Sequence, residues 1–576
     1  QYTDANGFQT NIQSGGNSRP TEEFKIDGSY FFTTSNLNHE LKFGGRTREA
    51  KTSTLWSYSG RNIFHYDGTY AGVAGDAALG AAFGLPPERA DDYSVVYAYR
   101  NEQPGTASNY DSLWVQDTMT MGSWTFNVGF RWDDQSGSNA AGEVEANLGF
   151  PTVMPAINYP GDNGGGLNWT SITPRLGVTY ALGEERKTLI RGSFSQFPDQ
   201  LSLGNISRLN PLGSSLVSML VVNDPGGFPG FYDDGEQFAV LQGFWGFDPA
   251  NPTSIANANV NDSSMDAPLT NELIVGAEHA FLPEFVTSLT VTWRKVTDVQ
   301  DFQRLFRNNS TGEVTTIPAS EYVRGPDIEI TVPGIGGPAA TYSQPYWSAN
   351  DNWSYTGGQL FTNGDREIDY LGATLGFTKR LANQWMMRGY VQYNFDESWN
   401  VPTSYFNNND PNRVLPGVAS GSTIDGSKYV VQSTGSGRNE SWLQSDWGWN
   451  LNGMYQVAPD RPWGFNVAAN MTGRNGYPIP YYRSRTGTDG ISRQIQAAPN
   501  IEDYRLGDLF TTDMRLEKEF RGTGNLGFTF SIDAFNIFND GVVLDRFRNT
   551  TSGNVGWIST SLAPRVYRLG VRVNWR

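Results

Sequence analysis

The most constraining feature of this sequence is an alternation of apolar and polar residues with a period of two, sustained over ten residues or more. In the segment 566–576, which reads VYRLGVRVNWR, the odd positions are apolar or aromatic and the even positions include three arginines. Successive side chains of a β-strand point to opposite faces. The segment is therefore expected to form a strand whose two faces meet different surroundings, one apolar and one wet.

The same alternation recurs in WTFNVGFRWD at 124–133, LFTTDMRLEKEF at 509–520 and NLGFTFSIDAFN at 525–536. Long strands of this kind are typical of a transmembrane β-barrel, which has lipid outside and water or protein inside. The residues predicted to face lipid or to lie in the interfacial girdles are Trp124, Phe126, Phe130, Trp132, Trp463, Phe528, Phe530, Tyr567, Leu569, Val571, Val573 and Trp575. The residues predicted to face the lumen are Arg131, Asp133, Asp513, Arg515, Glu517, Asp533, Arg568 and Arg572.

The links between the predicted strands argue against a soluble β-sandwich, which also alternates but usually has strands of about 5 to 6 residues. Short links near 521–525, 458–462, 381–384, 282–285, 182–186 and 121–123 alternate with long ones at 540–562, 475–505, 397–443, 300–364, 198–269 and 135–170. Outer-membrane barrels have short periplasmic turns and long extracellular loops. The pattern therefore favours an all-β fold, a large transmembrane antiparallel β-barrel.

The long links are rich in Gly, Asn, Asp, Pro and aromatic residues. This composition is typical of solvated turns, but binding residues also concentrate on loops held by a rigid scaffold. Both interpretations stay open at the level of sequence. Asp365, Glu367 and Asp369 stand at alternate positions of one strand, where they are expected to be lumen-facing or loop-base acids rather than catalytic carboxylates.

The composition of the chain argues against several other classes of protein. The chain has no cysteine, and its three histidines lie far apart without the spacing of metal ligands. No run approaches the ~18 apolar residues that a transmembrane helix needs. The net charge of −17 argues against nucleic-acid binding and favours cationic or neutral solutes over polyanions. No catalytic motif, metal site or cofactor is indicated, so the chain is not expected to be an enzyme.

The number of strands bears on how much of a barrel the chain contains. The pattern predicts strands near 22–34, 39–50, 110–120, 124–134, 171–181, 187–197, 270–281, 286–299, 365–379, 385–396, 444–457, 463–474, 507–520, 526–538 and 564–576, and two more near 54–66 and 92–103. Bacterial single-chain barrels have an even number of strands, whereas this total, about 17 by the period-two template, is odd. We therefore expect residues 1–576 to be the C-terminal part of one outer-membrane β-barrel domain, with at least one strand upstream.

The motifs on these strands resemble those of TonB-dependent outer-membrane receptors. Within that family the sequence is most similar to the large Oar-like receptors. One hairpin joins the pair Gln116 and Asp117 to Gly129 and Arg131 on the next strand. The other residues that carry the resemblance are Lys42–Gly45, Pro174, Arg175, Gly177, Tyr180, Arg191, Gly192, Phe194, Thr378–Trp385, Asp513, Arg515, Lys518, Asp533, Phe535, Asn536, Phe538 and Asn539. Their order along nearly the whole chain makes the resemblance specific.

The resemblance implies a 22-stranded barrel in the outer membrane of a Gram-negative cell, filled by a plug domain and coupled to the TonB complex. Such receptors bind a scarce solute with their extracellular loops and import it by plug movement. We find neither plug nor TonB box in this sequence and expect both upstream. The family usually ends on an aromatic residue that the barrel-assembly machinery reads, and position 577 would face lipid, so one more aromatic residue is expected there.

Two other functions stay open at this point. The chain could be a structural or adhesive barrel whose long loops bind a surface protein partner. It could also be a passive porin, although porins typically have about 16 to 18 strands. A plug and TonB box, a stable protein partner on the loops, or an open conducting lumen would distinguish transport, adhesion and passive diffusion.

Overall fold

The computed structural model describes residues 13–58, 63–66, 93–100, 104–147, 151–213, 216–222, 238–245, 251–364, 367–400, 428–429, 445–498, 503–521 and 526–575. Asp365, the last residue Arg576 and the side chain of His65 lie outside this description.

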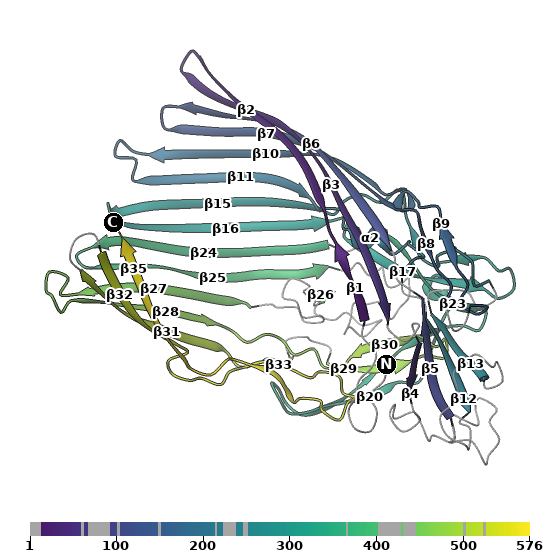
Figure 1. Cartoon of the computed structure of the whole chain (residues 1–576). Helices are drawn as coiled ribbons and strands as arrows, with labels where there is room; N and C mark the ends of the chain where they lie inside the picture. The colour runs from purple at the N-terminus through teal and green to yellow at the C-terminus, as the bar shows by residue number, and fades with distance from the viewer. Residues whose placement is uncertain are drawn as a thin grey trace.

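One antiparallel sheet of 17 strands forms the body of the molecule (Figure 1). Its strands are β1 (Gln13–Ser18), β2 (Thr21–Thr34), β3 (Leu37–Tyr58), β6 (Gly105–Met121), β7 (Trp124–Asn139), β10 (Asn168–Leu182), β11 (Thr188–Pro198), β15 (Leu269–Leu282), β16 (Phe285–Thr297), β24 (Glu367–Ala382), β25 (Trp385–Asn400), β26 (Lys428–Tyr429), β27 (Trp447–Val457), β28 (Phe465–Arg474), β31 (Leu509–Arg521), β32 (Leu526–Phe535) and β35 (Val566–Trp575). We call this sheet the wall.

The rows of the wall pair in the order in which they follow along the chain, so the sheet is a meander. Strands β1 and β2 pair with successive parts of β3, and β26 and β27 pair with successive parts of β25. The 17 strands therefore make 15 rows. Among the described residues β35 pairs only with β32, and β1 and β2 pair only with β3. The wall consequently has two free edges in this structure.

All fifteen of the principal strands expected from the period-two pattern are present, but the two additional ones are not rows of the wall. Strand β3 continues to Tyr58. The strands β4 (Ile63–Tyr66) and β5 (Tyr93–Tyr99) lie in a separate four-stranded sheet with β12 (Leu216–Val222) and β13 (Phe238–Trp245). Alternation predicts a strand but carries no information about which sheet it joins, so these two segments add no further rows to the described part of the wall.

The two ends of the wall differ as expected. Figure 1 shows the tight turns on the left and the long connections, with their own small strands, on the right. The turn from β6 to β7 contains only Gly122 and Ser123, and Gly122 takes a positive φ of 60° there. At the turn from β24 to β25, buried Lys379 donates from Nζ to the carbonyl oxygens of Ala382 (2.8 Å) and Trp385 (3.0 Å). Hydrogen bonds of this kind stabilise the short turns.

The long connections carry the remaining elements. They are β8 (Gly142–Val144), β9 (Ile157–Tyr159), η2 (Gly164–Gly166), α2 (Leu203–Ser207), β14 (Val260–Asn261), β17 (Gln300–Asn308), β18 (Val314–Thr315), η4 (Ala319–Glu321), β19 (Tyr322–Arg324), β20 (Ile328–Val332), β21 (Ala340–Gln344), β22 (Trp347–Ala349), β23 (Trp353–Asn363), β29 (Tyr482–Thr486), β30 (Ser492–Gln496), β33 (Val543–Arg546) and β34 (Ile558–Ser561). Within the described ranges, no helix has the length and apolar character required to cross a membrane.

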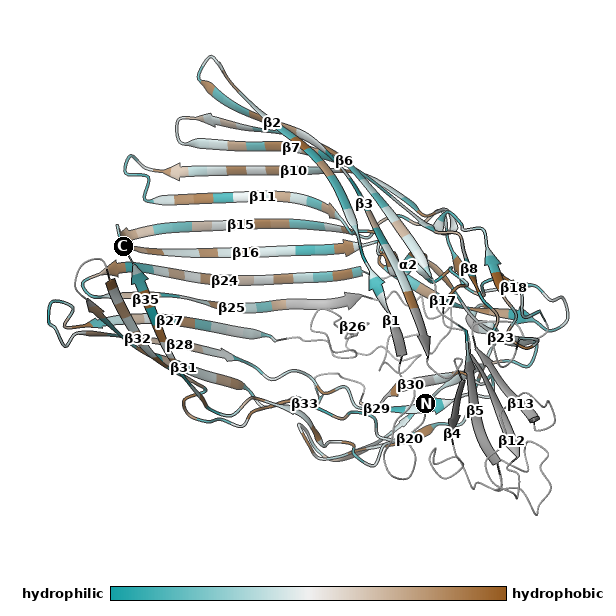
Figure 2. Ribbon diagram, in the orientation of Figure 1, coloured by the Kyte–Doolittle hydropathy of each residue, from teal (hydrophilic) through white to brown (hydrophobic). Residues whose placement is uncertain are grey.

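The two faces of the wall are chemically distinct, and Figure 2 shows hydrophobic and hydrophilic residues alternating along its strands. On β7 the side chain of Phe130 is 52% exposed, whereas Asp133 on the opposite face is completely buried. This distribution is the reverse of that in a soluble protein, where apolar side chains are buried. We call the face that carries Phe130 the apolar face and the face that carries Asp133 the polar face.

Candidate functional site

The polar face of β6 and β7 carries a buried charge network. Tyr110 donates its hydroxyl hydrogen to Asp133 at 2.5 Å, and Arg131 donates from Nε to both oxygens of the same carboxylate at 2.8 and 3.0 Å. Loop residues cover the network on the side of the long connections, where Gln135 accepts a hydrogen bond from the backbone nitrogen of Leu201. The polar face is thus lined with chain at this end, as the interior of a barrel is.

A second charge network joins the last three rows. Asp533 on β32 is nearly buried and lies 3.3 Å from Nε of Arg515 on β31 and 2.9 Å from Nη2 of Arg568 on β35. Glu517 lies 3.4 Å from the same Arg515. The remaining predicted lumen residues share this face. Asp513 accepts a hydrogen bond from the backbone nitrogen of Asn536, and Arg572 lies beside Arg568 in a shallow pocket.

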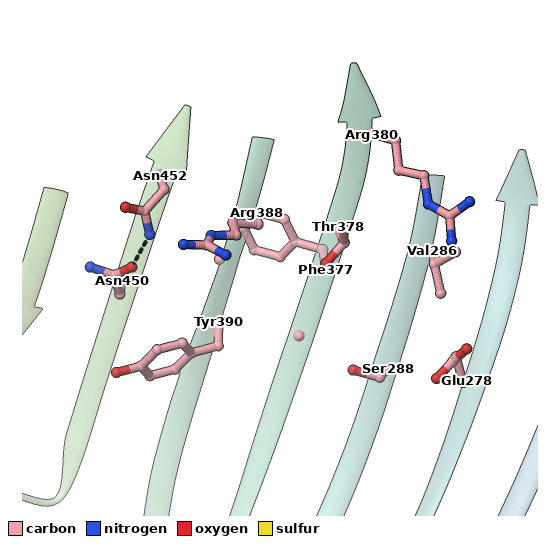
Figure 3. A pocket seen from close by; sticks show the side chains of 12 residues that line it. Glu278, Val286, Ser288, Phe377, Thr378, Arg380, Arg388, Tyr390, Asn450 and Asn452 are labelled. Carbon is pink, nitrogen blue, oxygen red and sulfur yellow. Dashed lines mark hydrogen bonds between the residues drawn. The ribbon is translucent and has the colours of Figure 1, made fainter. Parts of the chain in front are cut away.

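Between these networks the polar face carries amide and hydroxyl groups together with ion-paired charges, such as Arg191 with Glu278 and Arg294 with Glu272. A pocket of about 580 Å³ is lined by side chains from β15, β16, β24, β25 and β27, and Figure 3 shows how these side chains lie. Arg388 and Tyr390 project from β25 beside Asn450 and Asn452 of β27, which hydrogen-bond to each other. The residues that line the pocket are Glu278, Val286, Ser288, Gly376, Phe377, Thr378, Arg380, Arg388, Gly389, Tyr390, Asn450 and Asn452. Amide, hydroxyl and guanidinium groups of this kind can hydrogen-bond to a polar solute or to another part of a protein.

The residues predicted to face lipid lie on the apolar face, with one exception. Leu569 is 79% and Trp575 is 83% exposed, and Phe126, Trp132 and Phe528 are partly covered by neighbours. The exposed members of the predicted set are Trp124, Phe130, Phe530, Tyr567, Leu569, Val571, Val573 and Trp575. Trp463 is also exposed, but it precedes β28 and stands in the short link after β27. Strand β28 therefore starts two residues later than expected, and Trp463 stays a predicted girdle residue at the end of the wall.

The acids at 367 and 369 are loop-base residues, but they do not face the lumen. The register pairs Asp369 with Lys295, which stands on the apolar face two residues beyond Trp293. Glu367 forms an ion pair with Lys295 at 2.7 Å. Both acids therefore mark the place near the long connections where the outer surface of the wall becomes polar. Period-two alternation places residues on a common side but does not by itself say which side that is.

Two of the histidines take part in specific contacts between strands. His39 lies 2.7 Å from Asp117 through Nδ1 and 2.8 Å from Thr34 through Nε2. His279 lies 2.7 Å from the hydroxyl of Thr188. Both histidines are near the short-turn end of the wall. Among the described residues, no group of three or more His, Cys, Asp or Glu side chains is arranged to hold a metal ion.

The long connections interlock instead of remaining separate solvated turns. The loop before β15 hydrogen-bonds to the loop before β10 through Asn261 and Gly164 (3.0 Å), and to the loop before β24 through Asp262 and Phe361 (2.8 Å). The loop before β24 bonds in turn to the loop before β31, and that loop bonds to the one before β35. We call these five connected loops the loop body.

Buried apolar clusters hold the loop body together. Among the described residues the largest cluster joins the loop before β24 to the loop before β31, and a second joins the three loops that begin after β7, β11 and β16. The members of the largest cluster are Ile328, Ile330, Val332, Tyr346, Ile479, Tyr481, Ile495, Ala497, Ala498 and Tyr504. A folded set of loops above a polar wall is the arrangement in which a rigid binding surface can be built.

Two titratable groups of the loop body have pKa values that are shifted by their surroundings. Hydrogen bonds from the hydroxyl and backbone nitrogen of Ser264, and from the hydroxyl of Thr362, lower the pKa of the Asp262 carboxyl. Burial raises the pKa of the Tyr504 phenol. The first group therefore stays charged and the second stays protonated at neutral pH. The Asp262 carboxylate can therefore accept its hydrogen bonds, and the Tyr504 phenol can donate to the carbonyl oxygen of Pro338.

A cluster of cations on the polar face of β2, β3, β7 and β10 was not predicted from the sequence. Its members are Lys25, Lys42, Arg46, Arg48, Arg131 and Arg175, of which only Arg131 had been assigned to the lumen. The alternation of Lys42, Arg46 and Arg48 in LKFGGRTR is a signal that could have identified it. The contributions of the other strands become visible only when the register brings the rows together.

The fold and its faces define a class, namely an outer-membrane β-barrel wall built of long antiparallel strands. The chain belongs to the outer membrane beta barrel domain family, whose family model matches residues 1–568. Membership confirms the predicted fold class and the localisation in the outer membrane of Gram-negative bacteria. The short turns of the wall then lie on the periplasmic side and the loop body on the extracellular side.

Solved structures of receptors show a similar arrangement of strands. The siderophore receptor PiuA from Acinetobacter baumannii is 11% identical, with a TM-score of 0.46 and coverage of 97% of this chain and 56% of that one. The ferric-catecholate import receptor Fiu from E. coli K12 is 9% identical, with a TM-score of 0.48 and coverage of 97% and 55%. The ferric citrate transporter FecA is 11% identical, with a TM-score of 0.47 and coverage of 98% and 56%.

The chain thus spans a little over half the length of these receptors. Comparison with curated protein sequences found none that matches.

Proposed function

We propose that this chain is the barrel wall of an outer-membrane receptor and transporter, which binds a solute with its extracellular loops and imports it. The observation that carries the proposal is the loop body, in which apolar clusters and hydrogen bonds join five loops above a polar-faced wall. A passive porin needs an unobstructed mouth, whereas a receptor needs a preorganised surface there. The receptors with a similar strand arrangement act on iron complexes, and the resemblance noted in the sequence points to the same general role.

Energy coupling through TonB and a plug domain is part of the same proposal. The polar face of the wall has the charged and amide side chains that could contact a folded domain within the lumen. We expect the plug and the remaining strands in the same protein, upstream of residue 1, with the free edges of β2 and β35 paired by those strands. The apolar face then contacts lipid around the whole circumference.

The test is solute uptake by cells that carry the native protein. Radiolabelled candidate solutes should accumulate in wild-type cells and fail to accumulate after deletion of the protein or after dissipation of the proton gradient. Uptake that survives loss of the gradient would contradict energy coupling. Conductance of the purified native protein in a planar bilayer without any gradient would contradict the receptor and support a porin.

A structural or adhesive role remains the second candidate because the loop body exposes large apolar side chains. Trp557 and Ile558 at the start of β34, and Val323 on β19, are all more than half exposed. Isolated exposed apolar residues are common on protein surfaces, so this observation is weaker than the one that supports transport. Stable co-purification of one surface protein, lost on removal of these loops, would favour adhesion.

A further inference from the structure

The polar face of the wall contains a pocket of about 610 Å³ where five rows, β2, β3, β6, β7 and β10, come together. Ligand sites in proteins usually have volumes between about 300 and 1,000 Å³. The side chains of five cations line this pocket, together with only two carboxylates, Glu23 and Asp27. The five cations are Lys25, Lys42, Arg46, Arg131 and Arg175.

The cations of this pocket are not fully compensated by nearby acids. Asp27, Glu40, Glu23 and Asp133 form ion pairs with Lys25, Lys42, Arg46 and Arg131, at 2.8 to 3.0 Å. Arg175 forms no ion pair with a described residue, and its guanidinium lies over the ring of Phe197 instead. The neighbouring Arg48 likewise has no acid partner in the described structure, and the buried Nε atoms of Arg46 and Arg48 lack a hydrogen-bond acceptor.

Aromatic rings hold these cations in place. Three guanidinium groups surround the ring of Tyr110 at 5.3 to 6.0 Å, and Trp114 lies under Lys25 and Arg131 at 5.7 and 5.5 Å. The indole of Trp114 fits only because residue 44 is glycine. A Cβ atom at Gly44 would come within 2.4 Å of the indole and within 2.6 Å of the backbone oxygen of Ile26 on β2. Cations that are fixed in advance lose little entropy when an anion binds.

We propose that this pocket binds a small organic anion that carries carboxylate or phosphate groups, which is the class of solute that the protein receives. An anion in the pocket would accept hydrogen bonds from the guanidinium of Arg175, and would neutralise the surplus positive charge. Arginine donates in a planar fork that matches carboxylate and phosphate oxygens. The inference rests on the proposed receptor function. It departs from the preference for cationic or neutral solutes that the net charge suggested, because the cations of the pocket lie together on the polar face, whereas the net charge is a sum over the whole chain.

The experiment is isothermal titration of the full-length protein in lipid nanodiscs with benzene-1,3,5-tricarboxylate, and with 1,3,5-tris(hydroxymethyl)benzene as the neutral control. We expect the tricarboxylate to bind and the neutral compound not to bind. Arg175→Gln should weaken binding about tenfold, which corresponds to the loss of one charge-assisted hydrogen bond. The matched control Arg572→Gln removes a cation from the polar face of β35 and should leave the affinity unchanged.

Gly44→Ala provides a second variant that changes no charge. It should displace Trp114 and weaken the tricarboxylate at least as much as Arg175→Gln, while the folded protein keeps its mobility in unheated gels. Absence of binding, or equal weakening by Arg572→Gln, would overturn the proposal. Tighter binding of a hexaglutamate peptide than of the tricarboxylate would assign the pocket to a protein partner and also overturn it. Because the titration does not require uptake, loss of binding and loss of transport are separate outcomes.

Discussion

The phenolic oxygens of Tyr342 and Tyr504 lie 3.0 Å apart, although 162 residues separate them along the chain. Tyr504 donates its own hydrogen to the carbonyl oxygen of Pro338 at 2.9 Å, so Tyr342 is the donor in the bond between the two phenols. One tyrosine belongs to the loop before β24 and the other to the loop before β31. These loops flank the rows of β25 and β27, and their contact therefore bridges the extracellular ends of those rows.

The loop body should respond as one unit when its core is opened. Ile330 is completely buried in the largest apolar cluster, and Ile330→Ala removes three methyl or methylene carbons from it. The expected loss of local stability is about 2 to 5 kcal/mol. Hydrogen exchange should become faster both in residues 328–347 and in residues 477–498, which belong to different loops.

The control for this experiment is Val323→Ala in the same loop, where the side chain is 59% exposed. Its effect on hydrogen exchange should be small, because little apolar area is removed from the interior. Faster exchange confined to residues 328–347 in the Ile330→Ala variant would show that the loops fold independently.

The orientation of the wall can be tested at two adjacent residues of β16. Val291 is on the apolar face, opposite Val275 and Ala373, and Thr292 is on the polar face. Val291→Arg should destabilise the native protein in a bilayer by about 2 to 4 kcal/mol, the cost of an arginine at the membrane midplane. Thr292→Arg should cost less than about 1 kcal/mol because arginines are common in wet barrel interiors.

Urea titration of the two variants in lipid vesicles, followed by the mobility of unheated samples in gels, measures this difference. Equal destabilisation by both substitutions would mean that the two faces do not meet different media, and the assignment of the apolar face to lipid would be withdrawn.

The network around Asp533 should stabilise the last rows of the wall. Asp533→Asn leaves Arg515 and Arg568 on neighbouring strands without their shared carboxylate. We expect a loss of about 1 to 3 kcal/mol, the usual effect of removing a nearly buried acceptor from charged donors. Thermal unfolding of the native protein in detergent would show it. Glu519→Gln on β31, where the side chain is exposed, should leave the transition within about 0.5 kcal/mol of wild type.

The hydrogen bonds that Asp262 accepts from Ser264 and Thr362 should make the loop body sensitive to acid. Because hydrogen bonds lower the pKa of Asp262 in the folded protein, the folded state holds this proton less tightly than the unfolded state does. The stabilisation is complete above the unfolded pKa of ~3.9, and it is lost as the pH falls through the lowered value. Asp262→Asn should therefore reduce stability at pH 7 and make no difference once the wild-type carboxyl is protonated. Proteolysis of the loops between pH 7 and pH 3 measures this. A constant difference over that range would contradict the linkage.

Much of the wall could be predicted from the sequence because the period of a strand is a local property. The alternation in 124–133 and 566–576 assigned residues such as Phe130 and Arg131 to opposite faces, and the structure keeps them there. The alternation of short and long links likewise separated the two ends of the wall. These features depend only on neighbouring residues and on the contrast between the two media that each strand separates.

Other features depended on contacts between distant segments, and only the tertiary structure decided them. The alternation in 92–103 did not show that β5 joins a sheet outside the wall, and nothing local brings Tyr342 to Tyr504 or gathers Arg46, Arg131 and Arg175 around one pocket. The sequence by itself determined which residues form strands and which side of a strand each one occupies. The register between rows and the packing of the loops determined which side chains meet, because those distances arise from pairing and burial across hundreds of residues.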